Sequence, residues 1–325
     1  MVESGGAPRN RILDISFNQD QGCFAISTEQ GFRIFNSYPF KDTFHRDFDA
    51  GIGKISMLFR SNILALVGGG TQPKYPPNKV IIWDDHQMKS IGELSFKTNV
   101  KGVKLRKERI AVILEQKVCI YQLSDLKLLD TIDTCDNPQG LCALSPRDEV
   151  ILVVPSNKKG YIQIMNYDTN LNVTKQAHES SISALAISQD GKMCATASDK
   201  GTLIRIFGTK DGSQVQELRR GMDKAEIHSL SFDKQYRWLA CTSDKGTVHI
   251  FSLDEAHKAT YKEDVKSEEQ KGETKNPTSA FKFMKGFFSY FKSEWSFSQF
   301  RIPDARSVVG FGPEDKNAIV GKVEC

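Results

Sequence analysis

Two adjacent arginines, Arg219 and Arg220, stand between two copies of one pentapeptide. The sequence Ser-Asp-Lys-Gly-Thr fills residues 198–202 and recurs at residues 243–247, 45 positions later. Arginine suits phosphate because its planar guanidinium group donates two parallel hydrogen bonds to an oxyanion. Two arginines between two like repeats therefore predict two phosphate pockets, one on each of two neighbouring units.

Further hydrogen-bond donors stand at matched positions around the arginines. The candidate phosphate-binding set is His178, Ser198, Thr202 and Arg205 in the first repeat, Arg219, Arg220 and Gly221 between the repeats, and His228, Ser243, Thr247 and His249 in the second. Strand alternation would turn Arg205 outward while Ile204 and Ile206 face the core, and His249 takes the equivalent place. Hydroxyl, imidazole and guanidinium groups can bind phosphates and sugar hydroxyls without a metal ion.

Several of these residues also have a purely structural interpretation. A Ser-Asp pair before a Gly-Thr turn often only caps the turn, and a histidine ahead of a propeller strand is often a structural hydrogen-bond partner. These alternatives stay open for the two serines and the two histidines that precede strands. For the adjacent arginines we favour a functional role, because a connection between strands has no packing reason to double them.

Catalytic and metal-binding signatures are missing from the sequence. There is no cysteine–arginine phosphatase signature, no HExxH motif and no P-loop, and no carboxylate pair can be placed at the arginines. The seven cysteines are scattered and form no CxxC pair, and those at 23, 119, 194 and 241 fall in apolar runs, where cysteine is a small core residue. We therefore expect no catalytic residue, no bound metal and no cofactor.

The bulk composition fits a soluble protein. The chain has 325 residues, 39% hydrophobic residues and a net charge of +4, which is too mild to identify a partner. No run approaches the ~18 apolar residues that span a bilayer. Residues 1–10 are polar and contain no apolar signal core. We therefore expect an intracellular protein.

Short β-branched and aromatic runs repeat along the chain and predict a propeller. They end at Phe35, Trp83, Tyr121, Met165, Phe207 and Phe251, at intervals of 38 to 48 residues. A second apolar run and an Asp/Gly turn precede most of them. Short alternating strands repeated at this interval are typical of propellers with four-stranded blades. A Trp-Asp dipeptide occurs at residues 83–84, but the WD pattern is eroded elsewhere.

Six such units end near Leu253, and a seventh begins at Ser307 with room for about two strands before Cys325. We therefore predict an all-β, seven-bladed WD40-like β-propeller with four-stranded blades, a single domain over residues 10–325, whose last blade is incomplete. An incomplete blade leaves edges exposed. Either the N-terminal segment completes that blade or the chain is a shortened version of a longer one, and we favour the second alternative.

A long insertion, residues 254–300, separates units six and seven within the sixth blade. Residues 254–275 carry twelve charges of both signs and predict a solvated, disordered linker. Residues 279–297 include eight aromatics and predict a helix with an apolar face and a lysine-bearing face, which is typical of an interfacial membrane helix. The candidate membrane-inserting residues are Phe281, Phe283, Met284, Phe287, Phe288, Phe291 and Trp295. The alternative is that these side chains pack against the propeller wall.

The motifs quoted above resemble those of the PROPPIN family, the phosphoinositide-binding propellers of autophagy that are called WIPI proteins in animals. That family carries Phe/Leu-Arg-Arg-Gly where this chain has residues 218–221, and close versions of residues 197–207 and 242–251. Residues 114–117 (Leu-Glu-Gln-Lys) and 137–141 (Asn-Pro-Gln-Gly-Leu) are also similar. The resemblance extends from about Asn10 to the end of the chain.

The resemblance implies two headgroup sites for phosphatidylinositol 3-phosphate and phosphatidylinositol 3,5-bisphosphate, one using Arg219 with unit five and one using Arg220 with unit six. It also implies that the aromatic insertion is the membrane loop of the sixth blade. It implies a scaffold for autophagosome formation, cytoplasmic and peripherally recruited to pre-autophagosomal and endosomal or vacuolar membranes. An autophagy protein partner would dock on blades two and three, where the candidate surface is Lys104, Arg106, Lys107 and Arg109.

Other functions remain as alternatives to a lipid effector. A propeller scaffold could use the arginines for an acidic or phosphorylated peptide without lipid. An enzyme acting on phosphoinositides lacks a catalytic signature. Nucleic acid is not an expected partner, because the aromatics form a helical stripe and not a stacking platform on strands.

Overall fold

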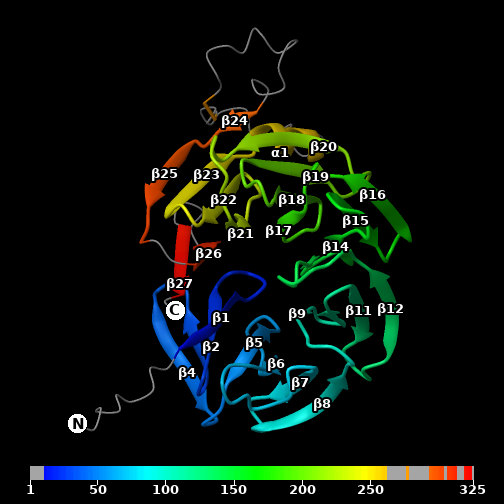
Figure 1. Ribbon diagram of the computed structural model, residues 1–325, viewed down its shortest axis with the longest axis vertical. Helices are drawn as coiled ribbons and strands as arrows, with labels where there is room; N and C mark the ends of the chain where they lie inside the picture. Colours follow the sequence, from blue (N-terminus) through cyan, green and yellow to red (C-terminus); the bar gives the residue numbers. More distant parts are fainter. Residues whose placement is uncertain (1–10, 262–275, 278–292, 304–305, 313–317, 324–325) are drawn as a thin grey trace, which may run out of the picture.

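The structure is a computed structural model that describes residues 11–261, 276–277, 293–303, 306–312 and 318–323. Figure 1 shows the sheets arranged as blades of a ring, with the first and last strands meeting on one side. The described residues form seven sheets. Five of them have four strands, one has five strands, and one has only two. The protein is therefore a β-propeller.

Blades one to three each contain four strands in chain order. Blade one holds β1 (Ile12–Phe17), β2 (Cys23–Thr28), β3 (Gly31–Asn36) and β4 (Lys41–Asp47). Blade two holds β5 (Ile52–Met57), β6 (Ile63–Gly68), β7 (Lys79–Asp84) and β8 (Lys89–Ser95). Blade three holds β9 (Gly102–Leu105), β10 (Arg109–Ile113), β11 (Lys117–Gln122) and β12 (Leu128–Asp133).

The later blades repeat this order, with additions in blades five and six. Blade four holds β13 (Ala143–Leu144), β14 (Ile151–Pro155), β15 (Tyr161–Asn166) and β16 (Leu171–Gln176). Blade five holds β17 (Ile182–Ile187), β18 (Met193–Ser198), β19 (Leu203–Gly208), β20 (Gln214–Arg219) and the added strand β24 (Glu294–Trp295). Blade six holds β21 (Ile227–Phe232), β22 (Trp238–Ser243), β23 (Thr247–Ser252) and β25 (Ser298–Arg301).

The prediction of seven blades is wrong: the described residues form six. The remaining sheet contains only β26 (Arg306–Phe311) and β27 (Ala318–Val323), paired as a hairpin. The expectation of an incomplete last unit agrees in part with this hairpin. Gln21 in the first turn of blade one closes the ring, because its amide donates to the Phe232 carbonyl (2.9 Å) and accepts from the Phe311 amide (2.5 Å).

Apolar alternation along the strands builds the core between blades. In β19, Ile204 and Ile206 are fully buried while Arg205 between them keeps part of its side chain in solvent, as the alternation predicts. Across the junction, Leu230 and Phe232 of β21 belong to the same buried cluster. The cysteines at 23, 119, 194 and 241 are buried free thiols, in agreement with their prediction as core residues.

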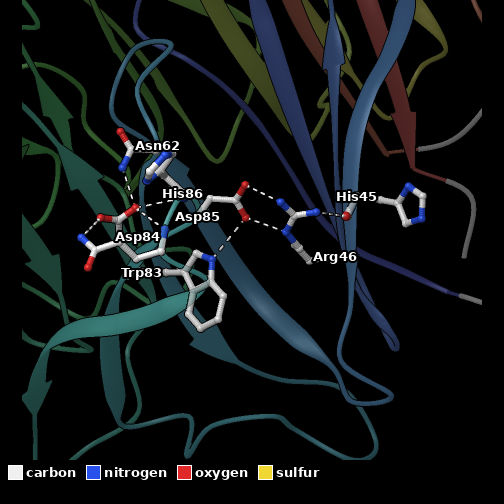
Figure 2. A network of polar contacts seen from close by, with 8 residues as sticks. His45, Arg46, Asn62, Trp83, Asp84, Asp85 and His86 are labelled. Atoms are coloured by element: carbon white, nitrogen blue, oxygen red, sulfur yellow. Dashed lines mark hydrogen bonds and ion pairs between the residues drawn. The ribbon is translucent and has the colours of Figure 1, made fainter.

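The Trp-Asp dipeptide of blade two lies at the junction with blade one (Figure 2). Arg46 in β4 donates two hydrogen bonds of 2.8 Å to the Asp85 carboxylate, and the Trp83 indole donates a third to Asp85 at 3.3 Å. The Asp84 carboxylate accepts instead from Asn62 and from the backbone of its own turn. The Arg46–Asp85 ion pair, supported by the Trp83 indole, therefore ties two neighbouring blades together.

The segment between β23 and β25 begins with a helix rather than a disordered linker. The helix α1 (Asp254–Thr260) follows β23 directly. Ala256 and Tyr261 are buried against blade five, and the Tyr261 hydroxyl donates to the Asp190 carboxylate at 2.6 Å. These two contacts order the start of a charge-rich sequence that looks solvated, so the prediction of disorder from residue 254 is wrong for residues 254–261. Residues 262–275 lie outside the described residues.

The predicted membrane helix lies mostly outside the described residues. Of the seven candidate inserting side chains, only Trp295 is described, and it belongs to strand β24. The helix predicted over 279–297 therefore does not continue through Trp295. Along the parts of the chain that the structure describes, no helix is long and apolar enough to cross a membrane.

Candidate functional site

The two pentapeptides form the turns between the second and third strands of blades five and six. Each turn needs a glycine, because Gly201 has φ of +62° and Gly246 has φ of +60°. A side chain at Gly201 would place its Cβ 1.9 Å from the Ala225 carbonyl oxygen. The Ser198 and Ser243 carbonyls accept hydrogen bonds from these glycine amides at 2.8 and 3.3 Å. The repeated sequence therefore produces two equivalent turns.

Arg219 is the last residue of β20 and is covered by the chain. Its side chain is 7% exposed, and its Nε donates a hydrogen bond of 2.8 Å to Ser293 Oγ. Ser293 itself is 1% exposed. Glu217 lies two residues earlier on the same face of the strand, while Leu218 between them faces the core shared with blade six.

Arg220 follows directly and is bound to the turn of blade five. Its amide donates to the Thr202 carbonyl at 2.9 Å, its Nε donates to the Gly201 carbonyl at 2.9 Å, and Nη2 donates to the Asp223 carbonyl. Its charge also reaches blade six, where burial first and then the Arg220 charge lower the pKa of His249. Gly221 has open space around it, so no packing at that position demands a glycine.

Two donors of the first repeat, His178 and Arg205, lie close together. His178 Nε2 lies 2.9 Å from Thr196 Oγ1, and burial, with Arg205 as the second cause, lowers the pKa of His178 to about 4. Arg205 donates to the Glu217 carboxylate at 2.9 Å and to the Ala177 carbonyl at 2.6 Å. The imidazole is therefore neutral at pH 7, and the guanidinium is already paired with a carboxylate.

The second repeat contributes His249 in the place that Arg205 takes in the first. His249 Nδ1 lies 3.2 Å from Ser296 Oγ. Burial, and then the charge of Arg220, lowers the pKa of His249 to about 4. Ser243 is 1% exposed, and the Thr247 hydroxyl donates to the Lys245 carbonyl at 3.4 Å. His249 is therefore also a neutral side chain covered by its own chain.

His228 stands apart from the other candidates. It lines a cavity of about 330 Å³ that is enclosed mainly by first strands of the blades, and its Nδ1 is buried without a hydrogen-bond partner among the described residues. Burial lowers the pKa of its imidazole. His228 is thus a residue of the central cavity as well as a neighbour of the Ser243 turn.

The C-terminal end of the insertion reaches the arginines as a short stretch that we call the foot segment, residues 293–297. Its strand β24 pairs in parallel with β20, with Glu294 opposite Leu218 and Trp295 opposite Arg219. The Glu294 carboxylate accepts from the amide groups of Gln216 (2.9 Å) and Asn276 (2.8 Å). Asn276 also exchanges hydrogen bonds with the Ser252 backbone. Both described ends of the insertion are thereby fixed beside Arg219.

Sequence reasoning missed the residues that contact the candidate donors. Glu217, Ser293 and Ser296 were not singled out, and neither was the carboxylate of Glu294 as an anchor. Only Glu217 left a usable signal, because it stands opposite Arg205 once β19 and β20 are paired as a hairpin. The foot segment pairs with β20 in parallel from 76 residues away, and no local sequence pattern indicates such a pairing.

Of the four basic residues predicted as a docking surface, one is buried and the others are at least partly exposed. Arg106 is buried, and its guanidinium donates to the backbone carbonyls of Ser145, Arg147, Asp148 and Glu149 and to the Ser145 hydroxyl. Lys104 and Lys107 are exposed, and Arg109 stacks over the Tyr167 ring at 5.1 Å. Arg106 therefore holds the first turn of blade four and is not part of an exposed surface.

A family model, curated relatives and solved structures all match this chain over most of its length. The family model described as PROPPIN matches residues 12–273. Autophagy-related protein 18e of Arabidopsis thaliana is 35% identical over 320 residues, which cover 96% of this chain and 81% of that protein. SVP1-like protein 2 of Neurospora crassa is 43% identical over 243 residues, 74% of this chain but only 56% of that protein's length. Kluyveromyces lactis Hsv2, solved with its complete loop 6CD, superposes with a TM-score of 0.77 at 27% identity, over 96% of this chain and 90% of that one.

Proposed function

The chain belongs to the PROPPIN family, and on that premise we propose that it binds phosphatidylinositol 3-phosphate and phosphatidylinositol 3,5-bisphosphate at membranes. The proposed role is that of a non-enzymatic scaffold for autophagosome formation. The relatives it matches include autophagy-related proteins, and the family that matches is not a catalytic one. The headgroups would bind at two pockets on either side of Arg219 and Arg220.

One observation carries this proposal: Arg219 ends β20 and Arg220 follows it directly, so two consecutive guanidinium groups stand between the two repeats. Arg219 shares a face with Glu217, which is bonded to Arg205 of the first repeat. Arg220 is hydrogen-bonded to the turn of blade five, and it lies close enough to the second repeat for its charge to add to the burial that lowers the pKa of His249. We infer that each repeat uses one cation of the pair, which is the arrangement that two phosphate pockets require.

The other donors fit a headgroup that carries both phosphate and hydroxyl groups. The neutral imidazoles of His178 and His249 can each donate one hydrogen bond and accept another, which suits the hydroxyls of an inositol ring. The arginines would supply charge-assisted bonds to the phosphate. Two such sites on one chain gain strength together at a membrane, because binding at the first raises the effective concentration at the second.

The insertion supports membrane contact by its position. Its two described ends, at Asn276 and Ser293, lie beside β20 and Arg219, so whatever extends from them starts next to the proposed pockets. Within the insertion of residues 254–300, we propose that the part between Pro277 and Ser293 forms a membrane loop of blade six and that its aromatic residues, from Phe281 to Phe291, insert into the bilayer. Recruitment would then be peripheral, at pre-autophagosomal and endosomal or vacuolar membranes.

A protein partner would complete the scaffold role. We propose that an autophagy protein docks on blades two and three, at a surface that includes Lys104, Lys107 and Arg109. Arg106 is excluded from this surface because its guanidinium is used within blade four's turn. Exposed cations at that surface favour a partner with acidic side chains.

Flotation with liposomes tests the proposed function. Wild-type protein should float with vesicles that contain phosphatidylinositol 3-phosphate and not with vesicles that contain only phosphatidylserine at equal surface charge. The double variant Arg219→Thr/Arg220→Thr should remain at the bottom, with thermal unfolding showing that it is folded. If that variant floats like the wild type, the proposal fails. Binding of a phosphorylated peptide without lipid, unchanged by deleting the insertion, would support the peptide alternative instead.

A further inference from the structure

The foot segment touches one donor of each proposed pocket. Ser293 Oγ accepts the hydrogen bond of Arg219 Nε at 2.8 Å. Three residues later, Ser296 Oγ lies 3.2 Å from His249 Nδ1. Arg219 belongs to the first pocket and His249 to the second, so one short stretch of chain supplies a hydroxyl oxygen to both.

The foot segment is held in place by contacts of its own. The Trp295 amide donates to the Pro277 carbonyl at 2.9 Å, and the Phe297 amide donates to the Ile250 carbonyl at 2.8 Å. The Glu294 carboxylate is shared by Gln216 and Asn276. The two serines therefore meet the donors in a fixed register and not by chance contact of a side chain at the surface.

We propose that the foot segment is an internal occupant of both pockets, and that a phosphorylated headgroup must displace it in order to bind. This inference rests on the proposed function and deepens it, because it states how the same pockets are regulated. In the arrangement described here, the Ser293 hydroxyl holds the Arg219 Nε–H that a phosphate oxygen would take. Ser296 does the same for the His249 imidazole.

Replacement of the serine hydroxyl by a phosphate oxygen is favourable for Arg219. A bond from a guanidinium to a phosphate oxygen is charged at both ends, and such bonds are roughly twice as strong as neutral ones. A serine hydroxyl, being neutral, is the weaker competitor. A headgroup oxygen and the foot segment therefore compete for the same Nε–H of Arg219 and the same Nδ1 of His249.

Two serine variants test the competition with a soluble probe. The probe is inositol 1,3-bisphosphate, which reports on the pockets without any contribution from membrane insertion. Ser293→Ala should bind it about threefold to tenfold more tightly than the wild type, the factor expected from losing one competing hydrogen bond. Ser296→Ala should show a similar gain. Ser298→Ala, an exposed serine on β25, is the matched control and should bind like the wild type.

Hydrogen exchange on the wild-type protein tests the inference even if a serine variant does not fold. Hydrogen exchange at the amides of Trp295 and Phe297 should become faster when inositol 1,3-bisphosphate is bound, because their acceptors Pro277 and Ile250 lose the foot segment. The amides of β7 in blade two serve as the internal reference and should not change. Slower or unchanged exchange at the foot segment would overturn the inference even if both serine variants unfold.

The outcomes separate this inference from the proposed function. Tighter binding in Ser293→Ala, together with faster exchange at the foot, supports both. Wild-type binding with equal or weaker binding in the folded serine variants overturns the inference alone, since a serine that served as a headgroup ligand would lower the affinity when removed. If neither the wild type nor any variant binds the probe or floats with 3-phosphoinositide vesicles, the proposed function and the inference fall together.

Discussion

Arg205 Nε donates a hydrogen bond of 2.9 Å to the Glu217 carboxylate directly across the β19–β20 ladder. The side chains are 25% and 17% exposed, so the pair is partly shielded from water. The guanidinium that the alternation pattern turned outward is thus engaged before any ligand arrives. A phosphate that uses Arg205 must share it with Glu217 or replace that carboxylate.

Replacing Glu217 with glutamine should therefore strengthen phosphoinositide binding. Glutamine keeps an oxygen acceptor for Arg205 but removes the competing charge, and the expected gain in vesicle affinity is about twofold to fivefold at low salt. The measurement is vesicle co-sedimentation over a range of salt concentrations. Glu108→Gln removes the same charge from an exposed turn of blade three and should bind like the wild type. Equal affinities for the two variants would show that Glu217 does not oppose the ligand.

Stability should fall when the pH drops from 7 to 5.5. The folded-state pKa values of His178 and His249 are about 4, below the ordinary value of 6.5, because burial disfavours the charged imidazole. Between pH 4 and 6.5 the unfolded chain binds protons that the folded chain does not, so this contribution is complete above about pH 6.5 and is lost as the pH falls. Each histidine should cost about 1 kcal/mol at pH 5.5.

Urea unfolding at both pH values measures this effect. The double variant His178→Gln/His249→Gln should lose less stability than the wild type over the same interval, because two of the titrating groups are gone. The comparison is made above pH 5 so that the carboxylates, which titrate lower, contribute little. A wild-type midpoint that stays constant from pH 7 to 5.5 would contradict the buried, neutral state of both imidazoles.

Arg106→Ala should destabilise the fold and leave lipid binding intact. Its loss removes the guanidinium that donates to the carbonyls of Ser145, Arg147 and Asp148 in the first turn of blade four, at an expected cost of about 3 kcal/mol. Chemical denaturation gives the free energy of unfolding, and flotation gives the binding. The neighbouring Lys107→Ala is the matched control, since Lys107 is exposed and its removal should change stability little. Equal stability of the two variants would show that the Arg106 contacts contribute nothing.

Regular elements of the fold could be predicted from the sequence because their signals are local. Alternation placed Ile204 and Ile206 in the core and Arg205 outside it, and the repeated pentapeptides marked two equivalent turns. The number of blades was overestimated because the count extended the repeat into the last 19 residues, where the described strands form only the hairpin β26–β27.

Features that depend on long-range contacts could not be predicted in this way. Arg106 stands in a charged stretch that looks solvated, and only the turn of blade four, about 40 residues later, buries it. The helix α1 lies in a charge-rich sequence, and the Tyr261 hydroxyl at its end donates a hydrogen bond to Asp190, some 70 residues earlier. The contact between Ser293 and Arg219 depends on a parallel strand pair that no spacing in the sequence announces.

If two separate headgroup pockets flank Arg219 and Arg220, the binding stoichiometry of a soluble headgroup must reflect both of them. Wild-type protein titrated with inositol 1,3-bisphosphate should bind two equivalents per chain. Arg219→Thr and Arg220→Thr should each bind one, and the double variant none, with all four proteins folded by thermal unfolding. A wild-type stoichiometry of one, or two equivalents retained in both single variants, would contradict the presence of two such pockets.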